Sequence, residues 1–442
     1  MALGLVRVSI ILGLASSVVL AQLSGSVGPT TPTSEKQATI CNVLDYGGEI
    51  GSSDIGPAIG NAFTECVLNN SGSTLYVPEG NYDMKTWQIL SGGTKWAFQM
   101  DGVITRASTA GGNMIVIENA DDFEFFSSNS AGAIQGLGYQ CRNTGPRLLR
   151  IETSTNYSVH DIILVDSPEF HLVIQQGSNG EIYNMAIRGT NLGGSDGIDV
   201  WGDNYWIHDV EVTNRDECVT VKSPSTNILV ERIWCNQSGG SAIGSLGTGT
   251  AIENILYRNV YTNGGNQIFM IKSNGGSGYL KNVLLQNFIA RGTAYGLDVD
   301  QFWSGTSTAA GDGVQLTNIT FENWDGAVVD GVQRSPIQFL CVGDVPCTEM
   351  TLSNVNLWSA TDEATNKCES AFGVGSCLQS GDASSYAVTI TSITEPAGFT
   401  TPPTLTGDLS SGFSTDSSIP IPTIPSTFFP GLPQISPLAK NL

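Results

Sequence analysis

The stretch Val159-His160-Asp161-Ile162 places a polar residue and an aspartate between two apolar residues. The same pattern, with Asn or Arg in some copies in the place of Asp, recurs at Ile182–Met185, Ile207–Val210, Val230–Ile233, Tyr257–Val260, Leu285–Phe288, Phe321–Trp324 and Leu352–Val355. The third residues of successive copies are 23 to 36 residues apart. This spacing is too irregular for a strict repeat and too persistent for chance.

A repeat of this length, with short β-branched runs, 52 glycines and almost no amphipathic helical pattern, indicates a solenoid of stacked β-coils. Side chains alternate along a strand, so each coil offers apolar residues to a shared interior and polar residues to the surface. Connections between parallel strands are right-handed. The sequence therefore predicts an all-β fold, a single-stranded right-handed parallel β-helix.

A short helix is expected to cover the N-terminal end of this stack, over residues 53–67, because an open end would expose unpaired strand edges. Ser53 or Asp54 can cap the helix, and Pro57 suits its first turn. The apolar residues of the segment fall on one helical face: Ile55, Ile59, Ala62, Phe63 and Cys66.

The two ends of the chain differ from the repeat region. Residues 1–21 carry Arg7, then an apolar run, and end Val19-Leu20-Ala21, the pattern of a cleaved signal peptide. We therefore expect a secreted, extracellular protein with one catalytic domain over residues 22–380. Residues 381–442 are rich in Ser, Thr and Pro, and we expect an O-glycosylated or disordered appendage there rather than packed structure.

Nine cysteines in an exported chain predict disulfides with one thiol left over. Short separations favour Cys341 with Cys347 and Cys368 with Cys377. Neighbouring coils favour Cys218 with Cys235, and Cys41 with Cys66 would tie down the N-terminal segment, which leaves Cys141 as an inert free thiol. Four Asn-X-Ser/Thr sequons mark candidate glycosylation sites at Asn69, Asn156, Asn236 and Asn318.

Acidic residues outnumber basic ones 41 to 19, which gives a formal net charge of −22. Such a chain has no electrostatic basis for binding nucleic acid or anionic membranes. If the substrate is an acidic polysaccharide, the protein repels it overall, so a few lysines must hold its carboxylates locally. At mildly acidic pH both protein and polymer lose negative charge, so we expect an acidic working range. We expect a monomer without metal or cofactor.

Residues that lie equally far along the sequence from the third residue of each copy stack in one column along the solenoid. Several polar residues share such a column. Asp216 lies at +7 from Asp209, and Tyr295 at +8 from Asn287. Asp196 and Lys272 reach the same column once the glycine-rich loops of their coils are allowed for, and His171 occupies it one coil earlier. The sequence thus predicts a groove on one face of the solenoid.

Three acids of this column, Asp196, Asp216 and Glu217, fit the hydrolysis of a glycosidic bond. One carboxyl must stay protonated to donate to the leaving oxygen, while others take a proton from water. Adjacent strand residues point to opposite faces, so Asp216 and Glu217 can act together only at a bend, which we predict at that point.

At these motifs the chain resembles the polygalacturonase-like glycoside hydrolases of family 28, and its rhamnogalacturonan hydrolase branch in particular. The likeness covers residues from about 40 to 360. It begins with Cys41–Gly47 and Val77–Tyr82, which look like the family's opening signature. The family's Asn-Thr-Asp, Asp-Asp, Gly-His-Gly and Arg-Ile-Lys motifs correspond to Gly194-Ser195-Asp196, Asp216-Glu217, Ser238-Gly239-Gly240 and Met270-Ile271-Lys272.

The resemblance implies that Asp216 is the general acid and that Asp196 with Glu217 positions and deprotonates the attacking water, with inversion at the anomeric carbon. It also implies substrate-binding roles for a second set of residues: Lys272, Tyr295, Lys222, Gly240 and His171. The family's motif histidine and arginine are replaced here by Gly239 and Met270. Their absence suits a polysaccharide backbone in which galacturonate alternates with rhamnose.

We therefore expect an endo-acting inverting hydrolase of the rhamnogalacturonan I backbone of pectin. A polygalacturonase or a xylogalacturonan hydrolase is the alternative within the same class. A pectin or rhamnogalacturonan lyase and a non-catalytic carbohydrate-binding β-helix are the alternatives of other classes.

Overall fold

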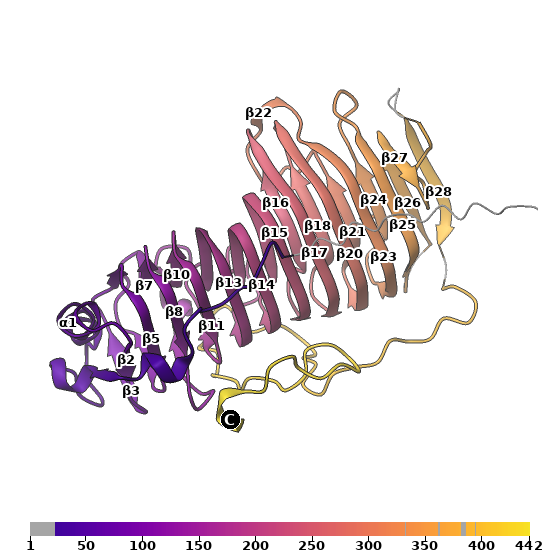
Figure 1. The fold of residues 1–442 in the computed structure, drawn as a ribbon. Coiled ribbons are helices and arrows are strands. Elements are labelled where there is room, and N and C mark those ends of the chain that lie inside the picture. Colours follow the sequence, from indigo (N-terminus) through magenta and orange to yellow (C-terminus); the bar gives the residue numbers. More distant parts are fainter. Residues whose placement is uncertain (1–22, 332, 361–362, 382–385, 394) are drawn as a thin grey trace, which may run out of the picture.

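The computed structural model describes residues 23–331, 333–360, 363–381, 386–393 and 395–442. The predicted signal segment, residues 1–21, lies outside the described residues. Parallel strands stack coil upon coil into one elongated right-handed parallel β-helix (Figure 1), which confirms the predicted fold.

The early coils have three short strands each, one on each face of the solenoid. The first face holds β1 (Thr39–Asn42), β2 (Ser73–Val77), β5 (Thr94–Met100), β8 (Asp121–Phe126) and β11 (Thr155–His160). The second holds β3 (Asn81–Met84), β6 (Val103–Arg106), β9 (Ala133–Gln135) and β12 (Ile163–Val165). The third holds β4 (Gln88–Ser91), β7 (Gly112–Glu118) and β10 (Pro146–Glu152).

In the later coils these short strands join into long bent ones. β13 (Leu172–Arg188) pairs with β10, β11 and β12 in turn, so it covers all three faces without a break. The same stack continues through β14 (Ile198–Thr213), β15 (Val219–Asn236), β17 (Thr250–Asn263), β20 (Gly278–Thr293), β23 (Gln315–Val328) and β25 (Cys347–Ser359).

The third face continues beyond β15 as a separate row of strands. It holds β16 (Ser241–Leu246), β18 (Gln267–Ser273), β21 (Tyr295–Asp300), β24 (Ile337–Leu340) and β26 (Ala364–Glu369). At the C-terminal end β27 (Ala371–Val374) follows β25, β28 (Ala387–Ile393) pairs antiparallel with β26, and β19 (Gly275–Gly276) pairs with β22 (Ala309–Asp312). Among the described residues there are also five 3-10 turns: Thr33–Lys36, Val43–Tyr46, Val67–Asn69, Gly138–Gln140 and Ala439–Asn441.

The repeated pattern has a direct structural meaning. Its first residues stack inside the solenoid in register, as in Val159, Ile182 and Ile207, all fully buried. Each such side chain contributes about 1.5–3 kcal/mol by its burial. The third residues have positive φ, and they turn the chain from one face to the next. Asn and Asp tolerate that conformation better than most residues, which explains their recurrence.

Helix α1 (Gly56–Glu65) covers the N-terminal end, as predicted, with Ile59, Ala62 and Phe63 buried against the first coils. Its N-cap is Ile55, which offers no side-chain cap, and Asp54 accepts the N–H of Gly56 at 3.2 Å. Within the part of the chain that the structure describes, no helix combines the length and apolar character that a bilayer crossing requires.

The four predicted disulfides are present, and Cys141 is free and buried. Of the sequons, Asn69 is exposed, whereas Asn156 and Asn318 are half-buried with their amides hydrogen bonded. Asn236 contradicts its prediction. Its side chain is fully buried and donates to Glu211 Oε1 and to the Gly407 carbonyl, so the fold leaves no room for a glycan there.

The C-terminal segment differs from the expectation of an unpacked appendage. Residues 395–442 run back along the outside of the solenoid (Figure 1), extended but packed. Trp234 and Tyr261 point outward from their strands and form an apolar strip. A small set of apolar tail residues covers that strip: Leu405, Ile419, Ile424, Phe428, Phe429 and Leu438. These residues are spaced among Ser, Thr and Pro, so the composition of the segment hides them.

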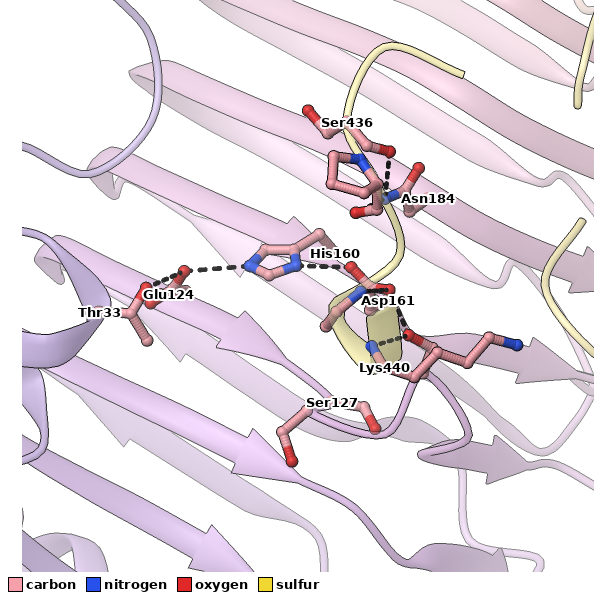
Figure 2. Close-up of polar contacts among 12 residues, drawn as sticks. Thr33, Glu124, Ser127, His160, Asp161, Asn184, Ser436 and Lys440 are labelled. Atoms are coloured by element: carbon pink, nitrogen blue, oxygen red, sulfur yellow. Dashed lines mark hydrogen bonds and ion pairs between the residues drawn. The ribbon is translucent and has the colours of Figure 1, made fainter. Parts of the chain in front are cut away.

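The third residues of the repeated pattern also anchor the tail, one coil at a time. Asp161 accepts the N–H of Ala439 at 2.8 Å (Figure 2). Asp209 accepts the N–H of Ile435 at the same distance. Between them Asn184 donates to the Ser436 and Pro437 carbonyls at 3.2 Å. Arg232 donates to the Pro433 carbonyl at 2.8 Å. From Asn259 onward the same positions bond to one another as an asparagine ladder.

Candidate active site

The acids of the predicted site lie where two long strands begin. Asp196 lies two residues before β14, and Asp216 and Glu217 lie in the bend between β14 and β15, which confirms the predicted bend. The side chain of Asn214 stabilises this bend. Its buried amide donates to the Ser195 carbonyl at 2.8 Å and to the Glu217 carbonyl at 2.9 Å. The two coils are thereby fixed relative to each other at the acids.

The three carboxylates converge. One side-chain oxygen each from Asp196, Asp216 and Glu217 lies within 4.8 Å of the other two. Asp196 and Glu217 are buried, while Asp216 is half-buried and is the most accessible of the three. Its carboxylate accepts the backbone N–H of Gly194 on Oδ2 and that of Glu217 on Oδ1, the latter at 3.0 Å.

A fourth acid, Asp199, joins this cluster and was not predicted. It lies on β14 between the buried Ile198 and Val200, so the alternation of the strand turns it to the same face as the other acids. That alternation was the signal that could have found it. Burial raises the pKa of Asp199, and the nearby Lys222 opposes this rise.

Burial also raises the pKa of Asp196 well above its ordinary value, and the carboxylates of Asp199 and Asp216 raise it further. Lys222 and Lys272 act in the opposite direction. Asp196 and Asp199 share a hydrogen bond. The free protein therefore keeps a proton on this pair at a pH where isolated aspartates are ionised.

Two predicted lysines supply the positive charge of the site. Lys272 on β18 donates to Glu217 Oε1. Lys222 Nζ lies 3.4 Å from Asp199 Oδ1 and 3.8 Å from Asp196 Oδ2. Carboxylate oxygens this close together are a ligand set that a cation can use, but here the two ammonium groups already provide the compensating charge.

Two predicted substrate contacts are wrong. His171 is fully buried, donates from Nδ1 to the Asp196 carbonyl at 3.0 Å and accepts the Ser167 N–H on Nε2. Burial lowers the pKa of His171 to about 4. It supports the backbone of Asp196 from inside and has no surface to offer a substrate.

Gly240 is likewise buried, at φ 84°, and its carbonyl accepts the Cys218 N–H at 2.8 Å. A Cβ at this position would lie 2.2 Å from the Gln267 carbonyl oxygen, so only glycine fits. Gly240 therefore supports the coil under the acid bend. Tyr295, by contrast, is half-buried at the start of β21, beneath the guanidinium of Arg334.

Comparison with known proteins agrees with this geometry. Residues 95–377 match the family of glycosyl hydrolases family 28. Rhamnogalacturonase A of Aspergillus niger is 54% identical over 437 residues, which cover 97% of each chain. Rhamnogalacturonase A of Emericella nidulans is 54% identical over 438 residues, covering 97% of this chain and 86% of that one.

Solved structures show the same fold at lower identity. The endo-xylogalacturonan hydrolase from Aspergillus tubingensis superimposes with a TM-score of 0.64 at 20% identity, covering 81% of this chain and 100% of that one. The polygalacturonase from Erwinia carotovora ssp. carotovora gives a TM-score of 0.58 at 18% identity, covering 77% and 97% of the two chains.

Proposed function

Since the chain belongs to the glycosyl hydrolases of family 28, we propose that it hydrolyses galacturonate–rhamnose bonds within the rhamnogalacturonan I backbone of pectin. The observation that carries this proposal is the convergence of Asp196, Asp216 and Glu217 within 4.8 Å, with Lys272 and Lys222 beside them. The names of the similar rhamnogalacturonases support the substrate.

In this proposal Asp216, the most accessible acid, donates a proton to the leaving oxygen, and Asp196 with Glu217 takes a proton from water. One observation opposes this division, because burial favours the protonated form of Asp196. The exchanged assignment, with Asp196 as the acid, is therefore the second candidate.

The pH dependence of kcat/KM separates the two assignments. Loss of the general acid abolishes the alkaline limb of the profile, and loss of the base abolishes the acidic limb. We expect Asp216→Asn to remove the alkaline limb and Asp196→Asn the acidic limb. The reverse result would make Asp196 the acid.

We also propose that cleavage inverts the anomeric carbon. One oxygen of each acid lies within 4.8 Å of the others, and the carboxyl groups are typically about 6.5–9.5 Å apart in inverting enzymes and about 5–5.5 Å apart in retaining ones. Proton NMR of the first product decides the point. A product anomer opposite to the cleaved bond supports inversion, and the same anomer means retention.

The substrate is tested by incubating the purified protein with rhamnogalacturonan, homogalacturonan and xylogalacturonan side by side and sizing the released oligosaccharides. We expect internal cleavage of rhamnogalacturonan to be fastest. Faster cleavage of homogalacturonan would favour the polygalacturonase alternative. Products that absorb in the ultraviolet, with activity lost to a chelator, would indicate a lyase.

We further propose that Lys272 and Lys222, which contact the acids, and Tyr295, farther along the same face, bind the substrate. The protein acts outside the cell as a monomer, after export directed by residues 1–21. Glycans at Asn69 and O-linked glycans on the tail belong to the same proposal.

A further inference from the structure

Arg334 lies in the turn before β24, and its guanidinium is only partly used by the protein. Nη1 donates to Gln267 Oε1 at 3.1 Å and lies 3.5 Å from Asp298 Oδ2. Among the described residues, no acceptor bonds to Nη2 or Nε of this side chain. The side chain is 21% exposed, so the guanidinium is partly accessible from the surface.

Two aromatic rings frame this guanidinium. Arg334 Cζ lies 4.1 Å from the ring centre of Tyr295 and 5.3 Å from that of Trp303. Both rings are half-buried, so part of each remains exposed beside the cation. Stacking on aromatic rings fixes the plane of a guanidinium and orients its free donors.

The position of Trp303 is set by the surrounding loop. The backbone N–H of Trp303 donates to the Ser273 carbonyl at 2.9 Å. A Cβ on residue 305 would lie 2.6 Å from the indole nitrogen, so Gly305 lets the chain cross the edge of the ring. The aromatic platform is therefore held in place from two sides.

A continuous series of contacts joins this platform to the acids. Lys272 donates to Glu217, and the same Nζ lies 5.9 Å from the ring centre of Trp303, which in turn neighbours Arg334. Tyr295 begins β21, the third coil beyond the bend that carries Glu217. Coils about 4.8 Å apart put the backbone of Tyr295 roughly 14 Å from the acid bend along the solenoid axis, and the Trp303 ring reaches back from there toward Lys272.

The chemistry of this platform suits a sugar that carries a carboxylate. A guanidinium binds a carboxylate through two parallel N–H groups, and an exposed aromatic ring packs against the apolar face of a pyranose. The protein as a whole is strongly acidic, at −22, so an acidic polymer needs local cations of this kind.

We infer that Arg334, Trp303 and Tyr295 form a distal subsite that binds a uronate residue of the polymer, on the C-terminal side of the acids along the solenoid. This inference rests on the proposed function, because it assumes that the substrate is a uronate-containing polysaccharide. Arg334 is then a specificity-determining residue that acts on binding rather than on bond cleavage.

The alternative explanation of Arg334 is purely structural, as the counter-ion of the buried Asp298. The test therefore measures binding directly, by calorimetry, in the Asp216→Asn background, with rhamnogalacturonan oligosaccharides and with the same oligosaccharides after reduction of their carboxyl groups. We expect Arg334→Gln to weaken binding of the intact oligosaccharides about tenfold or more and to leave binding of the reduced ones unchanged.

Lys281 provides the matched control. Its ammonium lies 4.5 Å from the ring centre of Tyr279 and pairs with Glu253 at 2.9 Å, and it takes no part in the contacts that join the platform to the acids. Lys281→Gln should leave both affinities unchanged. In otherwise wild-type enzyme, Arg334→Gln should raise KM on the polymer while kcat stays within about twofold.

Equal affinities of the intact oligosaccharides for the Arg334→Gln and parent proteins would overturn the subsite. If Arg334→Gln does not fold, Arg334→Lys, which keeps the charge but loses the planar fork, takes its place and should bind with intermediate affinity. Failure of the wild-type enzyme to cleave rhamnogalacturonan would contradict the proposed function instead, and the binding measurement would still decide the subsite.

Discussion

At the scale of single residues, the acid cluster is governed by how deeply each carboxyl is buried. Burial raises the pKa values of Asp196 and Asp199, whereas Asp216 is more accessible and its carboxylate accepts two backbone N–H groups. The raised pKa values of the two buried aspartates therefore follow from their position in the coil rather than from their residue type.

Asp199→Asn tests this coupling. Removing the Asp199 charge takes away one cause of the raised pKa of Asp196, so the pKa of Asp196 should fall. The limb of the pH–rate profile that reports Asp196 should move to lower pH, and kcat should fall about tenfold or more. Asp203→Asn, on the same strand but away from the cluster, is the control. An unmoved profile would show that Asp199 does not influence Asp196.

Offsets from the repeated pattern brought Asp196, Asp216 and Lys272 into one column, Glu217 follows Asp216 directly, and the family resemblance added Lys222 to the predicted site. The offsets placed His171 wrongly, because an offset in a column does not reveal whether a side chain points in or out at a coil end. Arg334 was missed because it lies in an irregular turn, where no period relates it to Tyr295 on the previous coil.

At the scale of elements, the bend between β14 and β15 is the feature on which the site depends. The Cys218–Cys235 disulfide begins directly after Glu217, and Cys218 N–H also donates to the Gly240 carbonyl. The disulfide therefore fixes the C-terminal end of the bend that orients Asp216 and Glu217.

We expect Cys218→Ser to lower kcat on the order of tenfold at a temperature where the variant is fully folded, because small displacements of catalytic groups have large effects. Loss of the disulfide should also cost about 2–5 kcal/mol of stability. Cys341→Ser, which breaks a bridge far along the chain, should lose stability without this loss of kcat. Equal kcat values for the two folded variants would show that the Cys218–Cys235 disulfide does not orient Asp216 and Glu217.

The elements themselves were largely predictable. The repeated pattern predicted the coils, because its apolar residues stack inside and its Asn or Asp residues turn the chain. The tail was not predictable in the same way. Its packing depends on Trp234 and Tyr261, whose outward orientation only the assembled coils reveal.

At the scale of the whole molecule, the tail ties early and late coils together, and part of its anchorage is titratable. His160 bonds to Asp161 at 2.9 Å and to Glu124 at 3.0 Å, and it is stacked between Phe126 and Tyr183. Burial alone would lower the pKa of His160, but the two carboxylates outweigh it and raise the pKa to about 8. Asp161 in turn binds the tail at Ala439.

The sign of the pH effect follows from this pKa. A histidine with a raised pKa stabilises the fold fully below its ordinary value of about 6.5 and loses that contribution as the pH rises through about 8. We therefore expect the last residues of the tail to become more sensitive to proteolysis above pH 8. His160→Gln should remove most of this pH dependence, and a protease-resistant tail at every pH in both proteins would contradict the prediction.

The account as a whole depends on the convergence of three acids from two successive coils, and turnover by Asp216→Asn tests it most directly. The release of reducing ends from rhamnogalacturonan is measured for the wild-type protein and for this variant, with the fold of each verified by circular dichroism and thermal unfolding. We expect the wild-type protein to release oligosaccharides and the folded variant to lose a factor of about 10³ or more in rate. A folded variant that cleaves the polymer at the wild-type rate would contradict the proposed site.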